Sequence, residues 1–100
     1  MIKGTTPTHI FTLPFDTGMI KTIQVAYAQG GVVMLTKGNA DCTFDQNMVS
    51  VRLSQEDTFL FAENACVEVQ VRVLTMEGEA LASGIMRIRC KDILTDEVLT

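Results

Sequence analysis

The clearest alternation of apolar and polar positions lies in residues 65–90. In its first half, ACVEVQVRVLT, one parity carries Val67, Val69, Val71 and Val73, and the other carries Glu68, Gln70 and Arg72. A period of two built on β-branched residues predicts a strand with one buried face. Residues 80–90 repeat the period, with Arg87 and Arg89 on the polar parity. The turn residues Glu77 and Gly78 join the two halves into a predicted hairpin.

The parities of this hairpin also predict its register. A two-residue turn at Glu77-Gly78 aligns the two apolar faces and sets Glu68 opposite Arg87 on the polar face. A slip of one residue would move the whole apolar set into water. A turn with an even number of residues is therefore expected, and a turn with an odd number is not. The predicted pairs on the apolar face are Val67 with Ile88, Val69 with Met86, Val71 with Gly84, and Val73 with Ala82.

Earlier residues predict five further strands, at 9–13, 19–29, 32–37, 41–45 and 48–53. In the second of these, Ile23, Val25 and Tyr27 share one face. Two-residue turns at Gly30-Gly31 and Gln46-Asn47 connect two more hairpins. The predicted pairs are Tyr27 with Met34, Ala26 with Leu35, Phe44 with Val49, and Cys42 with Val51.

One helical turn is expected at residues 54–60, because Ser54 followed by Asp57 forms a capping box. This turn would carry the chain from one sheet to the other, with Leu60 or Phe61 closing the end of the core. The regular turns and the near absence of helix predict an all-β fold, a small antiparallel β-sandwich of six to seven strands. A small barrel is the alternative.

Composition narrows the class of protein. The 100 residues are 47% hydrophobic and 20% charged, which indicates one folded domain over residues 1–100. A net charge of −4 disfavours nucleic acid and anionic membranes as partners. No apolar run approaches the roughly 20 residues of a membrane span, and the N-terminus lacks the apolar core of a signal peptide. Synthesis in the cytoplasm is therefore expected.

Candidate chemistry is sparse. Cys42, Cys66 and Cys90 form no CxxC pair, and His9 is the single histidine, so we expect free thiols, some of them buried, with no metal and no cofactor. His9 has no nucleophile nearby in sequence and is interpreted as a strand residue at a rim or edge. The adjacent acids at 56–57 and 96–97 are typical of solvated turns. The sequence thus predicts no enzyme and no catalytic residue.

A basic stripe occupies one face of the last predicted strand, where Arg87, Arg89 and Lys91 alternate and Arg72 lies within reach. A groove for nucleic acid would require interleaved aromatic residues and a basic domain. The stripe is instead typical of a solvated sheet face, or of a sheet edge guarded against additional strands. With no Trp and a single Tyr, the chain also lacks the aromatic platforms of sugar-binding sandwiches.

Five segments carry a family resemblance: GTTPTHIFTLPFD (4–16), IKTIQVAYAQ (20–29), VRLSQEDTFLF (51–61), VQVRVLTMEGEALAS (69–83) and DEVL (96–99). Over nearly all its length, the chain resembles a small protein type encoded in prophages of Gram-positive gut bacteria. Its second half is similar to the N-terminal domain of phage upper-baseplate proteins, where the matching patterns are VRLSQEDT and VQVRVLTMEG. Upper-baseplate proteins continue into receptor-binding segments, which the resemblance does not cover.

The resemblance implies an immunoglobulin-like sandwich that acts as a non-enzymatic virion, tail or baseplate component through protein–protein contacts. The implied partners are other phage tail or baseplate proteins, and the implied location is the assembled virion after synthesis in the bacterial cytoplasm. The alternative is a small binding module for carbohydrate or a host surface protein. No binding or catalytic residue is carried over, because the matching motifs mark turns and core positions.

The final segment DILTDEVLT allows several interpretations. The first interpretation is a final edge strand, and the second is a tail that becomes ordered only against a partner. In the third, its apolar residues cover the bottom of the domain's own core. We hypothesise self-association, or docking onto a tail partner, through an edge strand and this segment. The predicted interaction surface consists of Leu94, Val98, Leu99, Arg87 and Arg89.

Overall fold

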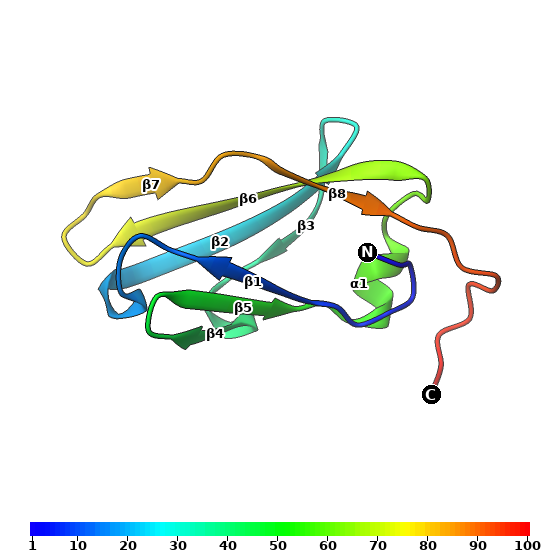
Figure 1. Cartoon of the computed structure of the whole chain (residues 1–100), viewed down its shortest axis with the longest axis horizontal. Coiled ribbons are helices and arrows are strands. Elements are labelled where there is room, and N and C mark those ends of the chain that lie inside the picture. The colour runs from blue at the N-terminus through cyan, green and yellow to red at the C-terminus, as the bar shows by residue number, and fades with distance from the viewer.

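Two antiparallel sheets pack face to face in the computed structural model, which describes all residues 1–100 (Figure 1). The three-stranded sheet has the order β1 (Thr8–Thr12), β5 (Met48–Arg52), β4 (Cys42–Asp45). The five-stranded sheet runs from β3 (Val32–Lys37) through β2 (Ile20–Gln29) to β6 (Ala65–Thr75). The remaining strands, β7 (Ala80–Ala82) and β8 (Met86–Cys90), pair one after the other with the free edge of β6.

This strand order is that of an immunoglobulin-like sandwich. The sheet β1-β5-β4 corresponds to strands B, E and D, and the sheet β3-β2-β6-β7/β8 corresponds to C′, C, F and G. Strand A is reduced to an isolated parallel bridge between Ile2 and Lys91, beyond the end of β8. The predicted fold class is therefore confirmed. Eight strands are present in place of six to seven. The single predicted strand over residues 80–90 is interrupted and forms two strands, β7 and β8, that both pair with β6.

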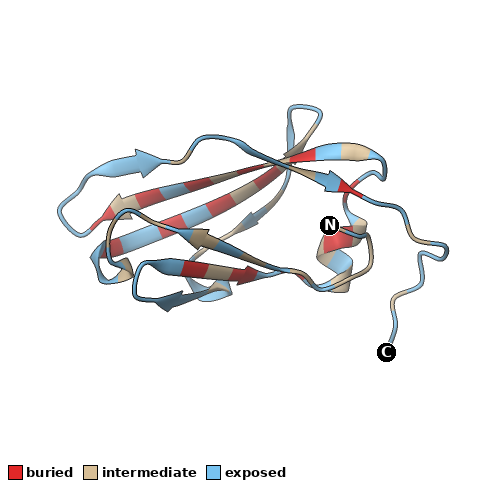
Figure 2. Ribbon diagram, in the orientation of Figure 1, coloured by how far each residue is buried: buried red, intermediate tan, exposed pale blue.

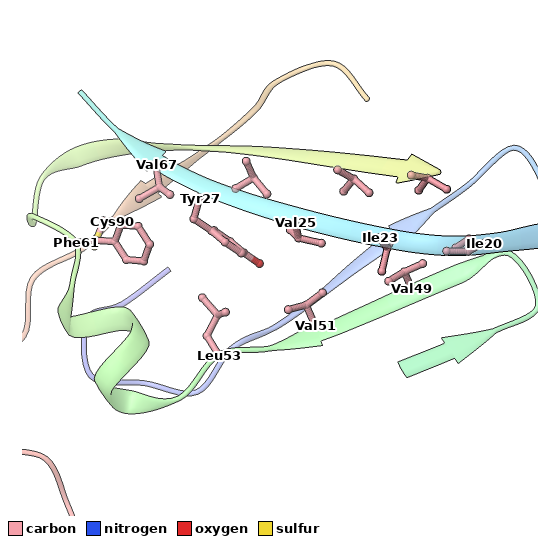
Figure 3. Close-up of a cluster of buried hydrophobic side chains, with 13 residues drawn as sticks. Ile20, Ile23, Val25, Tyr27, Val49, Val51, Leu53, Phe61, Val67 and Cys90 are labelled. Atoms are coloured by element: carbon pink, nitrogen blue, oxygen red, sulfur yellow. The ribbon is translucent and has the colours of Figure 1, made fainter. Parts of the chain in front are cut away.

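The core lies between the sheets, and Figure 2 shows buried residues alternating with exposed or half-buried ones along β2 and β6. The predicted core residues Val69 and Val71 are buried, with 0% and 3% of their surface exposed. Side chains from both sheets meet in the cluster shown in Figure 3. Its labelled members are Ile20, Ile23, Val25, Tyr27, Val49, Val51, Leu53, Phe61, Val67 and Cys90.

The helix α1 (Gln55–Phe59) carries the chain between the sheets, as predicted. The Ser54 hydroxyl accepts the Asp57 backbone N–H at 3.1 Å, and the Asp57 carboxylate accepts the Ser54 N–H at 2.9 Å. This reciprocal capping satisfies N–H groups that the first helical turn leaves unpaired. Phe61 closes the end of the core with 1% of its surface exposed, whereas Leu60 faces outward. No helix in the chain has the length and apolar character of a membrane span.

Two 3₁₀ turns complete the connections, at Thr17–Met19 before β2 and at Asn39–Asp41 before β4. The second one is tied to β2, because the Asn39 side-chain oxygen accepts the Ile23 N–H at 2.9 Å. A short segment at the end of the β3 edge is thereby fixed against the central strand of the larger sheet.

The predicted register of β6 is right along β8 and wrong along β7. Val67 lies opposite Ile88 and Glu68 opposite Arg87, as expected. Val73, however, lies opposite Leu81, one residue earlier than predicted, and Arg72 takes the position opposite Ala82. The cause is an odd turn of three residues, 76–78, closed by the Thr75 N–H on the Glu79 carbonyl at 2.9 Å. A left-handed Gly78, with φ of +91°, makes this turn accessible.

An irregularity at Ser83 restores the register between β7 and β8. The Ser83 N–H donates to the Val71 carbonyl at 2.8 Å, and the Ser83 hydroxyl accepts the Val71 N–H at 3.0 Å. A side chain thus replaces a backbone acceptor in the ladder, and the chain takes up one additional residue before β8 begins. The extra residue compensates the odd turn, which explains why both halves keep their apolar faces toward the core.

A bulge also modifies the hairpin formed by β2 and β3. Its two-residue Gly30-Gly31 turn is confirmed, with both φ angles positive, and next to the turn Ala28 lies opposite Val33. Beyond the bulge, Tyr27 lies opposite Leu35 and not Met34, and Ala26 lies opposite Thr36 and not Leu35. The shift turns Leu35 and Lys37 inward, and Lys37 reaches Asp57 of α1 at 2.9 Å. The Gln46-Asn47 hairpin has its predicted pairs, Phe44–Val49 and Cys42–Val51.

Candidate interaction surface

The predicted basic residues lie on the outer face of the five-stranded sheet. Arg87 and Arg89 of β8 stand opposite Glu68 and Cys66 of β6, on the side away from the core. The Arg87 guanidinium lies 3.9 Å from the Glu68 carboxylate, and its side chain remains 67% exposed. Arg89 and Arg72 make no ion pair. An ion pair this long and exposed contributes little to stability. The guanidinium groups of Arg72, Arg87 and Arg89 can therefore pair with acidic groups of another molecule.

The predicted apolar anchors lie in a C-terminal tail, residues 92–100, that belongs to neither sheet (Figure 1). Leu94 is fully exposed, Leu99 is 74% exposed, and Val98 is half-buried. The prediction of a final edge strand is wrong, because no residue of the tail pairs with a sheet. The prediction that the tail covers the core is wrong for both leucines. Leu94 and Leu99 therefore contribute little to the packing of their own domain, whereas Ile93 and Val98 of the same segment are half-buried.

Gln55 of α1 holds the far end of this tail. Its side-chain amide donates to the Leu99 carbonyl at 3.0 Å and accepts the Leu99 N–H at 2.9 Å. The two bonds reproduce the pairing of an adjacent strand and leave the Leu99 side chain pointing outward. Sequence reasoning missed Gln55, since a glutamine in a short helix gives no signal of its own.

The N-terminal residues cover only the last part of the β8 edge. The Met1 amino group donates to the Arg89 carbonyl at 3.0 Å, and the Lys91 N–H donates to the Met1 carbonyl at 2.8 Å. Lys3 binds the Lys91 carbonyl through its N–H and Glu63 through its ammonium at 3.1 Å, and the hydrogen bond to Glu63 raises the pKa of Lys3. The outer edges of β7 and of the first residues of β8 are left without a paired strand.

Besides a hollow of about 330 Å³ over β2, β6 and β7, which includes Gln24, Arg72 and Ala80, two hollows border these elements. The first, about 310 Å³, lies between the end of β1 and β7, and it is lined largely by Leu13, Pro14, Phe15, Val71, Val73 and Leu81. The second, about 230 Å³, lies on the outer sheet face and includes Ala26, Ala28, Val33 and Ile85. The small alanines of the second hollow stood on the polar parity of the second predicted strand. Sequence reasoning missed their importance because a small residue on an outer face gives no signal by itself.

The reactive residue types do not gather into a site. His9 lies half-buried between the sheets, where its Nδ1 contacts the Tyr27 hydroxyl at 2.8 Å. Burial raises the pKa of the thiols of Cys42 and Cys90, which are half-buried and buried, while Cys66 is exposed. No three His, Cys, Asp or Glu side chains converge in a group that could hold a metal ion. The expected burial of some cysteines is confirmed.

Comparison with known proteins adds one similar structure. The V domain of amphioxus IgVJ-C2 aligns over 93% of this chain and 97% of its own, with 12% sequence identity and a TM-score of 0.39. That score is below the level at which a shared fold is inferred, so the fold assignment follows from the strand order alone. No family model and no curated protein matches the sequence.

Proposed function

We propose that this chain is a non-enzymatic structural protein that works by protein–protein contact, as a component of a phage tail or baseplate. The observation that carries the contact role is the tail, where Leu94 is fully exposed and Leu99 is 74% exposed. Large apolar side chains held in water by an ordered segment are typical of surfaces that meet a partner. The phage context follows from the resemblance of segments 4–16, 20–29, 51–61, 69–83 and 96–99.

The unpaired sheet edges support the same role. β1, β3, β4 and the β7–β8 arm each end a sheet, and backbone N–H and C=O groups along these edges have no partner strand, except where the N-terminal residues cover the end of β8. Such edges accept strands from partner chains in many assemblies. The inner space between the sheets is filled by apolar side chains, and the single histidine is engaged with a buried tyrosine. These features favour a contact protein over an enzyme.

Co-sedimentation tests this proposal. The full chain, carrying a small epitope tag at its N-terminus, is produced in a host that releases phage particles from the prophage that encodes it, and the particles are purified by density gradient. The tagged chain is expected in the particle fraction, and a variant lacking residues 93–100 is expected to be reduced there. Absence of the full chain from the particles, together with specific binding on a glycan array, would instead favour a carbohydrate-binding module.

A further inference from the structure

The hollow on the outer face of the five-stranded sheet combines apolar walls with polar neighbours. Its volume is about 230 Å³, and its lining includes Ala26 and Ala28 of β2, Val33 of β3, Ile85 just before β8, and Glu68 and Gln70 of β6. Val33 and Ile85 are 59% and 52% exposed. The hollow is open above β2 because Ala26 and Ala28 have small side chains. They lie on the outer face of the strand, whose inner face carries Val25 and Tyr27. A volume of about 230 Å³ is large enough to accept one large aliphatic side chain.

The charge on this face is opposite to that of the whole chain. Arg72, Arg87 and Arg89 lie on the outer face of β6 and β8, and Glu68 is the single acid among them. The chain as a whole has a net charge of −4. Three of its acids, Asp92, Asp96 and Glu97, lie in the tail and form no ion pair. The basic face and the acidic, apolar tail are complementary to each other.

The spacing of groups on the tail matches the spacing on β8. Ile85, at the wall of the hollow, and Arg87 are two residues apart, which is about 7 Å along a strand. Leu99 and Glu97 are also two residues apart and share one side of an extended chain. A tail running antiparallel to β8 therefore sets Leu99 against Ile85 at the same time as Glu97 meets Arg87. Asp96 lies on the other side of the extended tail and has no part in this match.

The tail is held away from the hollow of its own domain. Gln55 fixes the Leu99 backbone beside α1 through two hydrogen bonds. In Figure 1, the C-terminus lies beyond α1, on the opposite side of the view from the hairpin of β2 and β3. The exposed side chains of Glu97 and Leu99 are therefore available for contact, and no residue of the tail lines the hollow of the same molecule.

We propose that the tail of one copy docks on the outer sheet face of the next, with Leu99 in the hollow and Glu97 on Arg87. The partner is a second copy of this chain, and the proposal rests on the proposed function as a protein that works by protein–protein contact. Because the tail and the hollow are different surfaces, the contact is head-to-tail, and repeating it produces a ring or an open filament. Each contact consists of one exposed ion pair, Glu97 with Arg87, and one buried apolar side chain, Leu99, so it is expected to be weak. Weak contacts are typical of assemblies that gain strength from many copies.

Two blocked variants test the contact in the full chain by sedimentation velocity. The first, Ile85→Lys with Arg87→Glu, keeps the tail and loses the docking face. The second, Glu97→Lys with Leu99→Lys, keeps the face and loses the tail. All four positions are exposed, so both variants are expected to keep the wild-type melting temperature. Each alone is expected to be monomeric, an equimolar mixture to form a dimer and nothing larger, and the wild type to form larger species as its concentration rises.

Single substitutions refine the test. Glu97→Lys is expected to weaken wild-type association roughly tenfold, since it replaces an attraction with a repulsion. Asp96→Lys makes the same charge change on the other side of the tail and is expected to have a clearly smaller effect. Equal effects of the two would overturn the assigned geometry. A monomeric wild type, or a mixture that forms no dimer, would overturn the docking itself.

The particle experiment separates failure of this inference from failure of the proposed function. If the wild type and the mixture stay monomeric while the full chain still sediments with particles, the head-to-tail contact is wrong and the structural role stands. If the mixture dimerises but the chain is absent from particles, the contact stands and the proposed phage role is wrong. If neither association nor co-sedimentation is found, both are wrong.

Discussion

His9 Nδ1 of β1 lies 2.8 Å from the Tyr27 hydroxyl of β2, and this part-buried contact joins the two sheets. Tyr27 is fully buried, and its ring packs at a tilt against Phe61 with 6.2 Å between centroids. Antibody domains link their sheets with a disulfide that packs on a tryptophan of strand C. Tyr27 lies on the corresponding strand here, and a polar contact replaces the covalent one.

This pair predicts a pH dependence of stability. Burial, followed by the positive N-terminus, lowers the pKa of His9 below its ordinary 6.5. The unfolded chain therefore binds a proton more readily than the folded one, and the stability contributed by neutral His9 is present above pH 6.5 and is lost as pH falls through the lowered folded pKa. Thermal melts between pH 8 and about 5 should show a falling melting temperature on the acid side.

A His9→Gln variant is the control for this prediction, since glutamine keeps a polar side chain and does not titrate. Its melting temperature should vary less than that of the wild type between pH 8 and about 5, where histidine is the one side-chain type with an unperturbed pKa. An equal slope in both proteins would show that other groups cause the dependence.

The sequence predicted those parts of the fold in which local pattern and turn chemistry agree. Val67 and Val69 alternate with polar residues and take their expected partners on β8. The Val73 partner was missed because Gly78 suits both a two-residue turn and the third position of a three-residue turn. An odd turn is tolerated only because Ser83 supplies a compensating residue and a hydroxyl acceptor. Such compensation between two local features is not visible in either one alone.

The interaction surface was predicted in part, for a similar reason. Arg87 and Arg89 alternate in a strand, so their common face follows directly from periodicity. The tail has no clean periodicity, because Leu94 and Val98 fall on one parity and Leu99 on the other. Its end is held by hydrogen bonds from Leu99 to Gln55, which lies 44 residues away in sequence. The hollow is formed by three strands, the turn at Gly31 and the loop at Ile85, so it depends on tertiary structure.

Val71→Asp is expected to unfold the domain or to lower its stability by several kcal/mol, because it places an unpaired carboxylate in a site with 3% exposure. Gln24→Asp is the matched control on the outer face of the adjacent strand β2, and it should cost about 1 kcal/mol or less. Urea unfolding measures both. A wild-type midpoint for Val71→Asp would contradict the assignment of strand faces.

Asp57→Ala is expected to destabilise the domain by about 1–2 kcal/mol, since Asp57 caps α1 and pairs with Lys37. Burial alone would raise the pKa of Asp57, but the Ser54 N–H and the Lys37 ammonium lower it overall. A lowered carboxyl pKa contributes stability above 3.8, lost as pH falls through the folded value. The neighbouring Glu56→Ala, at an exposed position, should change the unfolding free energy by less than about 0.5 kcal/mol.

The three cysteines should react at different rates. Cys66 is exposed, whereas burial protects Cys90 and Cys42 and raises the pKa of both thiols. A thiol reagent should therefore modify one group rapidly in the native protein and three after unfolding without oxygen. Cys66→Ser should remove the rapid phase and leave the slow ones. A total of one thiol in the unfolded protein would reveal a disulfide and refute the prediction of free cysteines.

Deletion of residues 93–100 should separate folding from assembly. Leu94 and Leu99 are exposed, Ile93 and Val98 are half-buried, and two surface hydrogen bonds join the tail to Gln55, so the free energy of unfolding should fall by only about 1–2 kcal/mol. Association measured by light scattering should disappear, because the deletion removes Glu97 and Leu99 together. Gln55→Ala is the companion variant: it frees the tail from α1 while leaving both anchors in place, so association should persist. A chain that is monomeric before and after the deletion, and whose melting temperature falls sharply, would place the tail in its own core and contradict the role of these residues in assembly.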